Sequence, residues 1–281
     1  MIHILKGILD SLTKSLDIFY VIKGNKPVAR ILYNENPALL DFLTLNNLYY
    51  EASDFKILKT IDTTRNFSDK GYIVNKDDKR TGIHFLYISK SKGLAKKAKA
   101  LEAKGNHQGF GKILGYPSCC CKFFEKYSET ASKGNNDFLK FTFASSEGIK
   151  FPWQNNFCLR VFDVSLISHF PCSFNCEKTK TLAKSNFDII NLYEQDLARY
   201  FQNALTGAVI YSDGVGVYNL KKYTLLESSI IYSPKDIITT NNNEFYSLLA
   251  SSNRLSFLSK NNILVGSTKI DDPHTFLGVF Q

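Results

Sequence analysis

The chain has 281 residues, 44% of them hydrophobic, and a formal net charge of +9 at pH 7. This length can bury a sizeable core in one large domain or two modest ones, and the longest apolar runs fall far short of the roughly 18 residues of a transmembrane helix. We therefore expect a globular protein without a membrane span and, because no secretory signal pattern is recognisable, a cytoplasmic one.

Residues 1–90 predict a small α+β region. Apolar residues recur at helical spacing over the first sixteen positions and indicate an amphipathic helix. Segments rich in Ile, Val, Tyr and Phe then predict strands of a small mixed sheet, and Asn36 followed by Pro37 opens a second helix. The predicted strands are 17–23, 28–33, 55–61 and 83–89, the second helix is 37–45, and polar loops are expected at 62–69 and 76–81.

Residues 91–206 predict a helical region that carries both cysteine clusters. Helices are expected at 91–104, 110–114 and 174–205, the last with a possible break near Ser185 and Asn186. The first of them is rich in lysine. On a helix these lysines spread over more than one face, as in a solvated surface helix. They are Lys90, Lys92, Lys96, Lys97, Lys99 and Lys104.

Residues 207–281 predict a β-rich C-terminal region. The strands 208–211 and 215–220 are joined by Ser212-Asp213-Gly214, a sequence typical of a β-hairpin. Further strands are expected at 224–232 and 262–266, with a helix at 244–250 between them. The fold class is therefore α+β, and we expect the three regions to pack as one unit.

Five of the six cysteines lie in two clusters about fifty residues apart. Cys119, Cys120 and Cys121 follow Tyr116-Pro117-Ser118, and Cys172 and Cys176 follow His169-Phe170-Pro171. In a reducing compartment, clustered thiols are more typical of metal binding or catalysis than of structural disulfides. The arrangement thus predicts a thiolate site.

Both clusters are expected at helix starts, because proline is tolerated in a first turn and serine is a good cap. With Ser118 as the cap, three cysteines fill the first turn, where the helix dipole lowers thiol pKa values. Neighbouring helical side chains diverge by about 100°, so we expect one or two of the three to be ligands. In the second cluster Ser173 is the expected cap, with Cys172 at or before it and Cys176 one turn later.

A four-ligand set can be assembled from these residues. His169, Cys172 and Cys176 supply one nitrogen and two sulfurs, and one or two thiolates of the first cluster complete the set. Sulfur-rich tetrahedral sites suit an iron–sulfur cluster or zinc. His169 has an alternative role as the partner of a backbone group, His107 is a weaker candidate, and Cys158 is expected in the core.

The segment 107–120 with Phe123 and Phe124, together with the segment 169–176, resembles an uncharacterised prokaryotic family catalogued as domain of unknown function 483. The resemblance covers about residues 90–190. Its specific part is a Gly-Tyr-Pro-x-Cys-Cys element paired with a His-x-Pro-Cys-Ser-x-x-Cys element. It implies that the functional positions are Cys119, Cys120, His169, Cys172 and Cys176, leaves Cys121 outside, and indicates no reaction.

Three functions remain open from the sequence. The first is a metal-thiolate enzyme of redox or sulfur-transfer type, with an iron–sulfur cluster or otherwise zinc, acting on a small molecule. The second is a zinc-stabilised module whose basic surface binds RNA or DNA. The third is a metal-free dithiol redox protein, for which the usual Cys-x-x-Cys motif is missing.

Overall fold

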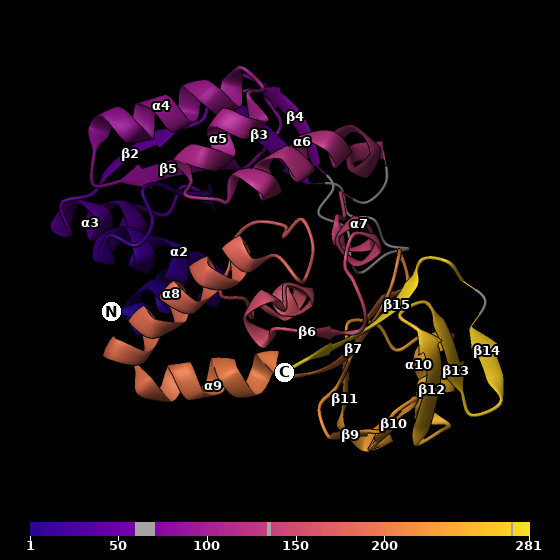
Figure 1. The fold of residues 1–281 in the computed structure, drawn as a ribbon. Helices are drawn as coiled ribbons and strands as arrows, with labels where there is room; N and C mark the ends of the chain where they lie inside the picture. Colours follow the sequence, from indigo (N-terminus) through magenta and orange to yellow (C-terminus); the bar gives the residue numbers. More distant parts are fainter. Residues whose placement is uncertain (60–70, 134–135, 271) are drawn as a thin grey trace. The chain divides into compact units, whose positions relative to one another are not determined.

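The computed structural model describes residues 1–59, 71–133, 136–270 and 272–281. These residues form a mixed α+β protein with N-terminal helices, several small sheets, a central helical region and a β-rich C-terminus (Figure 1), which confirms the predicted class. Two compact units can be distinguished, one holding the described residues up to Glu129 and the other those from Thr130 on. Within the described ranges, no helix has the length and apolarity to cross a membrane.

The first unit is built around a three-stranded antiparallel sheet in the order β1-β5-β2. Side chains of β5 alternate between its two faces: Leu86 and Ile88 pack against α1, α2 and α3, whereas Phe85 and Tyr87 face α4 and α5. Strands β3 and β4 form a separate hairpin. The elements are α1 Ile2–Leu9, α2 Leu12–Lys23, β1 Ala29–Tyr33, α3 Pro37–Leu45, β2 Tyr49–Ala52, β3 Phe55–Lys59, β4 Gly71–Asn75, β5 His84–Ser89, α4 Lys92–Ala103, α5 His107–Ile113 and α6 Ser118–Lys133.

The predicted N-terminal helix is broken, and the strand predicted at 17–23 is wrong. Asp10 adopts a left-handed conformation (φ 48°), and the Ser11 hydroxyl then accepts a hydrogen bond from the Lys14 amide at 3.3 Å. The new helix, α2, continues until Gly24 (φ 79°). Most of its side chains are buried. A helix buried on most sides has a continuous apolar sequence that resembles a buried strand, which is why the pattern misled.

Elsewhere in this unit the predicted elements are found, but strands β2 and β4 were missed. The helix predicted at 37–45 is α3, and those at 91–104 and 110–114 correspond to α4 and α5. The Asn36 side chain does not cap α3 but donates to the carbonyl of Ile8 at 2.9 Å. Strand 28–33 is β1 and strand 83–89 is β5. Strand 55–61 is observed as β3 in its described part, whereas residues 60–61 and the loop 62–69 lie outside the described residues.

The second unit contains two five-stranded sheets, β11-β8-β7-β15-β6 and β14-β13-β12-β10-β9. Side chains from both sheets, among them Ile210, Leu220, Ile230 and Leu255, form one core. Helices α8 and α9 follow each other as a pair (Figure 1). The elements are α7 Leu139–Ala144, β6 Lys150–Phe151, α8 Glu177–Tyr193, α9 Gln195–Leu205, β7 Gly207–Ser212, β8 Gly216–Leu220, β9 Tyr223–Leu225, β10 Ser229–Tyr232, β11 Ile237–Thr239, α10 Glu244–Ala250, β12 Arg254–Ser259, β13 Asn262–Val265, β14 Thr268–Ile270 and β15 Thr275–Phe280.

The predicted helix 174–205 begins later and breaks elsewhere. Glu194, whose backbone is not helical (φ −148°, ψ 69°), separates α8 from α9. Asn186 stays inside α8, where its side chain donates to the carbonyl of Leu166 at 2.8 Å. The hairpin at β7 and β8 and the helix α10 match the prediction, whereas 224–232 is two strands around a turn. The missed strands of this unit are β6, β11, β12, β14 and β15.

Candidate metal centre

The first cysteine cluster opens a helix, as predicted. After α5, Gly115 adopts a left-handed conformation (φ +84°) and the Tyr116 amide donates back to the carbonyl of Gly111 at 3.0 Å. Helix α6 begins at Ser118, and the Cys121 amide donates to the carbonyl of Pro117 at 3.0 Å. The helix therefore starts one residue before the position expected with Ser118 as its cap.

Within this cluster, Cys121 is separated from the other two thiols. The sulfur atoms of Cys119 and Cys120 lie 3.9 Å apart, far beyond the roughly 2.05 Å of a disulfide bond. Cys121 instead packs on Gly111 of α5, where a Cβ would meet its sulfur at 2.6 Å, and its sulfur lies 3.7 Å from the carbonyl oxygen of Tyr116. Burial raises the pKa of Cys121, so the expectation of a lowered pKa throughout this first turn is wrong for that residue.

The second cluster lies in a turn ahead of its helix rather than inside it. The Cys176 amide donates to the Ser173 carbonyl at 3.1 Å, and the Asn175 amide donates to the Ser173 hydroxyl at 3.1 Å. Helix α8 begins at Glu177, and the carbonyl of Cys176 accepts from the Lys180 amide at 3.0 Å. The prediction that Ser173 caps the helix with Cys176 in its first turn is therefore wrong.

Polar side chains from distant segments hold this turn, which we call the cysteine loop (residues 171–176). Thr142 donates to the carbonyl of Pro171 at 2.8 Å, and the Ser146 hydroxyl accepts from the Phe174 amide at 2.8 Å. The fully buried amide of Asn155 donates to the carbonyls of Phe174 (2.9 Å) and Cys176 (3.2 Å). These bonds give partners to buried backbone groups of the irregular turn and thereby stabilise it.

An aromatic side chain anchors the same loop. Phe174 is fully buried. Its ring centroid lies 4.7 Å from that of Phe143, 5.3 Å from that of Phe151 and 5.1 Å from that of Phe280. The loop is held by this packing and by the hydrogen bonds of three side chains, so the protein itself positions the backbone of Cys172 and Cys176.

Four thiols come together. The sulfur atoms of Cys119, Cys120, Cys172 and Cys176 lie within 4.8 Å of one another. Cys120 is buried and the other three residues are half-buried. This four-thiol group can bind a metal, because deprotonated cysteines are the preferred ligands of zinc, iron and copper.

The remaining predicted residues lie outside the four-thiol group, which is the set of converging ligand atoms in the described part of the chain. His169 is buried, and its Nε2 lies 3.1 Å from the hydroxyl of Thr179 in α8; its role as a ligand stays a prediction. His107 packs edge-to-face on Phe124 with ring centroids 5.4 Å apart. Cys158 is buried and burial raises its pKa strongly, as expected of a core thiol.

Sequence reasoning missed Thr142, Ser146 and Asn155, because their partners are backbone groups far along the chain. The available signal was weak: polar residues inside aromatic-rich segments, such as Asn155 after Trp153. Comparison with protein-family models, curated proteins and solved structures finds no match. The site is therefore interpreted from its own chemistry.

Proposed function

We propose that the chain is a metal-thiolate protein in which Cys119, Cys120, Cys172 and Cys176 bind one metal ion, with zinc as the first choice. The observation that carries the proposal is the approach of four sulfur atoms to within 4.8 Å of one another. Four thiols that converge in this way are unusual without a function, because thiolates repel one another unless a cation neutralises them. A bound metal ion supplies that charge.

The sulfur separations favour a single ion over a cluster. Four thiolates at about 2.3 Å from one zinc ion stand about 3.8 Å apart at the corners of a tetrahedron. The sulfurs of Cys119 and Cys120, 3.9 Å apart, meet this spacing. An iron–sulfur cluster places several iron and sulfide atoms between its thiolates and holds them farther apart. The iron–sulfur centre remains the second choice of metal group.

The number of ligands favours a structural role. Structural zinc sites have four protein ligands, whereas catalytic sites keep one position open for water or substrate. With all four thiols bound, no position is open. The redox or sulfur-transfer enzyme requires only three cysteines to ligate, which leaves one thiol to react. The resemblance over residues 90–190 points to the same four cysteines, together with His169, and is part of this proposal.

Metal analysis of the full chain, purified without chelators, tests the proposal. We expect about one zinc per chain and a colourless protein. Changing any one of the four cysteines to serine should lower the metal content, whereas C121S and C158S, which alter thiols outside the group, should retain it. Reconstitution with cobalt(II) adds a spectroscopic readout, since tetrahedral thiolate coordination gives strong visible absorption that C176S should weaken.

Four results would count against this function. Metal far below one ion per chain, or equal losses in C121S and C176S, would overturn the four-cysteine site. Brown protein with matching amounts of iron and sulfide would replace the single ion with a cluster. A C119S or C172S variant that keeps its metal but loses a thiol-dependent reaction would favour the three-ligand enzyme.

A further inference from the structure

The lysines expected to spread over more than one face of helix α4 are less scattered, because four of them share one exposed face. Lys92, Lys96, Lys97 and Lys104, the last at the C-terminal cap, are all exposed. At 100° per residue they fall within about 140° of the helix circumference, while Ala95 and Ala98 are buried on the opposite side. The exposed positions between the lysines hold only glycine and alanine: Gly93, Ala100 and Ala103. We call this surface the lysine face.

Acidic side chains do not neutralise the lysine face. The one acidic residue of α4, Glu102, is directed inward, where its carboxylate accepts from Arg30 at 2.6 Å and from the hydroxyl of Tyr87. Lys99 lies outside the face and pairs with Asp54 at 2.8 Å. In the described parts of the chain, none of the four lysines of the face forms an ion pair with an acidic residue.

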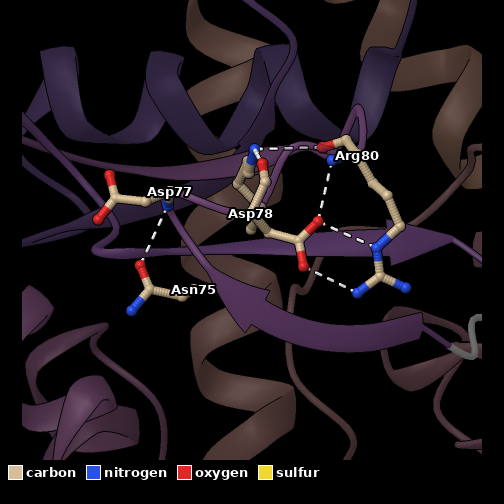
Figure 2. A network of polar contacts seen from close by, with 5 residues as sticks. Asn75, Asp77, Asp78 and Arg80 are labelled. Carbon is tan, nitrogen blue, oxygen red and sulfur yellow. Dashed lines mark hydrogen bonds and ion pairs between the residues drawn. The ribbon is translucent and has the colours of Figure 1, made fainter.

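Arg80 and Lys56, two other basic groups of the first unit, are occupied. Figure 2 shows Arg80 held by both carboxylate oxygens of Asp78, at 3.0 and 2.8 Å, with the adjoining turn closed by Asn75 and Asp77. The guanidinium lowers the pKa of Asp78 well below its usual range. The Lys56 ammonium is directed to the backbone carbonyls of Asp78 and Arg80. Arg80 and Lys56 thus have partners, whereas the four lysines of the face form no ion pair in the described parts of the chain.

The positive charge of the chain is also unevenly distributed. The sequence segments of the first unit contain 20 Lys and Arg against 12 Asp and Glu, whereas those of the second contain 15 against 14. Nearly all of the net charge of +9 thus belongs to the first unit. A polyanion is attracted to such a surface over distances comparable to the Debye length, about 8 Å at physiological salt.

We propose that the lysine face binds the phosphate backbone of a single-stranded nucleic acid. From Lys92 to Lys104 the helix rises about 18 Å, which is long enough to meet several consecutive phosphates. Tyr49, 51% exposed, lies on the edge strand β2 opposite Ser89, at the end of the sheet from which α4 begins. Tyr49 thus offers an exposed ring near the start of α4, and unpaired bases stack on exposed aromatic rings.

A membrane surface fits this face less well. Amphipathic helices that bind anionic lipid insert large apolar side chains beside their basic residues. The lysine face has only glycine and alanine between its lysines, which gives a bilayer nothing to bury. The tyrosine at the sheet edge likewise suits a base more than an acyl chain. This inference is independent of the metal proposed above.

Binding of the full chain to a labelled single-stranded RNA of mixed sequence tests the inference. K92Q/K96Q/K97Q should weaken binding tenfold or more at low salt and reduce the slope of log affinity against log salt by about 2, since single strands contribute about 0.7 per neutralised phosphate. The matched control K222Q/K235Q/K269Q removes three exposed lysines of the second unit and should leave affinity within twofold. Y49A should weaken the binding of single-stranded RNA about fivefold or more, and should weaken the binding of a duplex less.

The design separates the other outcomes. An equal loss of RNA affinity in both triple variants would mean that only the net charge of the chain matters. That result would overturn the lysine face as a binding site. Wild-type affinity in K92Q/K96Q/K97Q, or no salt-sensitive binding of RNA or single-stranded DNA, would do the same. Binding to phosphatidylserine vesicles without binding to RNA would assign the face to a membrane. Unchanged metal content in all variants shows that the four-thiol group is intact, so failure here leaves the metal proposal standing.

Discussion

The two cysteine segments of the candidate centre are positioned by different means. Cys119 and Cys120 lie in the first turn of a regular helix, set by the Pro117 carbonyl and by the left-handed turn at Gly115. Cys172 and Cys176 lie in an irregular turn, held by Thr142, by Ser146 and by the amide of Asn155. The first arrangement is encoded by neighbouring residues, and the second by residues up to about thirty positions away.

This difference determines how each segment should respond to mutation. A helix start depends on backbone geometry, so single side-chain changes around it should have modest effects. An irregular loop lacks the regular backbone hydrogen bonds of a helix or strand. Its conformation therefore depends on each side chain that forms a hydrogen bond with its backbone. Variants in the second unit should therefore perturb the metal site more than those near α6.

The largest expected effect is the loss of the anchor in the cysteine loop. F174A should lower the free energy of unfolding by about 3–5 kcal/mol, the usual cost of truncating a buried phenylalanine, and should also weaken metal binding, because the loop loses its fixed position. Urea unfolding and zinc titration measure the two effects.

The control for F174A is F276A. Phe276 stacks on Phe143 with ring centroids 5.3 Å apart but lies in β15, outside the loop. It should cost stability while leaving zinc affinity nearly unchanged. If both variants lose zinc equally, the aromatic cluster supports the whole unit and does not position the loop specifically.

The same distinction explains what the sequence could predict. Pro117 and Ser118 indicate a helix start from neighbouring residues alone. Ser212-Asp213-Gly214 indicates a hairpin in the same way, so the sequence predicts both. Ser173 gave an equally good local signal for a cap, yet the helix begins at Glu177, and the turn before it is held by Asn155, which donates to the carbonyls of Phe174 and Cys176. A contact nineteen or more residues away leaves no trace in local periodicity.

The candidate site shows the same limits. Cysteine is rare and reactive, so a cluster of cysteines indicates a site even without knowledge of the fold. For this reason the sequence alone was enough to group Cys119, Cys120, Cys172 and Cys176. Helical geometry showed only that the three neighbouring cysteines cannot all face one point, and which of them stays outside came from the resemblance and not from spacing. The role of Asn155 could not be inferred, because buried asparagine is recognisable only once its backbone partners are located.

The second prediction concerns Asp137, which precedes α7, the helix that carries Thr142 and ends shortly before Ser146. Burial raises the pKa of this carboxyl from 3.8 to about 6, although the Leu139 amide and the Tyr211 hydroxyl donate to it and favour the charged form; Asp213 and Lys140 lie nearby with opposing effects. Since the folded state binds the proton more tightly, the stabilisation is complete below pH 3.8 and is lost as the pH rises to about 6.

The loss should amount to at most about 3 kcal/mol, since each pKa unit corresponds to about 1.4 kcal/mol. D137N removes the ionisation and keeps the acceptor for Leu139. The difference in unfolding free energy between D137N and the wild type, measured from pH 3.5 to 7, should grow in favour of D137N across this window. A constant difference would show that Asp137 does not ionise there and that α7 is insensitive to it.

The third prediction compares two adjacent asparagines. Both Asn155 and Asn156 are buried, and each donates to a carbonyl: Asn155 to the cysteine loop, Asn156 to Leu205 at the end of α9, at 2.7 Å. N155A and N156A should each cost about 1–3 kcal/mol, because each leaves a buried carbonyl unpaired. Only N155A should also weaken zinc binding, by about 10–100-fold, the usual cost of losing a group that orients metal ligands.

Competition with a zinc chelator measures this difference, and unfolding midpoints confirm that the two variants are equally destabilised. Cobalt spectra add a direct readout of ligand geometry, which should change in N155A and not in N156A. Equal zinc affinity in the two variants would mean that the turn keeps its shape without the Asn155 hydrogen bonds, and the contrast between the two segments would then weaken.

The smallest expected effect concerns the helix start that carries Cys119 and Cys120. It tests whether neighbouring residues alone set the geometry of this segment. A Cβ on Gly111 would meet the Cys121 sulfur at 2.6 Å, so G111A forces the thiol to move. Overpacking costs about 1–3 kcal/mol, and the better helix propensity of alanine returns about 1 kcal/mol, which leaves a net loss near 1 kcal/mol. In the C121A background the sulfur is gone, and G111A should become neutral or slightly stabilising. Because Cys121 lies outside the four-thiol group, zinc content should stay at the wild-type level in all three variants; a loss of zinc in G111A alone would show that strain at Cys121 reaches Cys119 and Cys120 through the helix start.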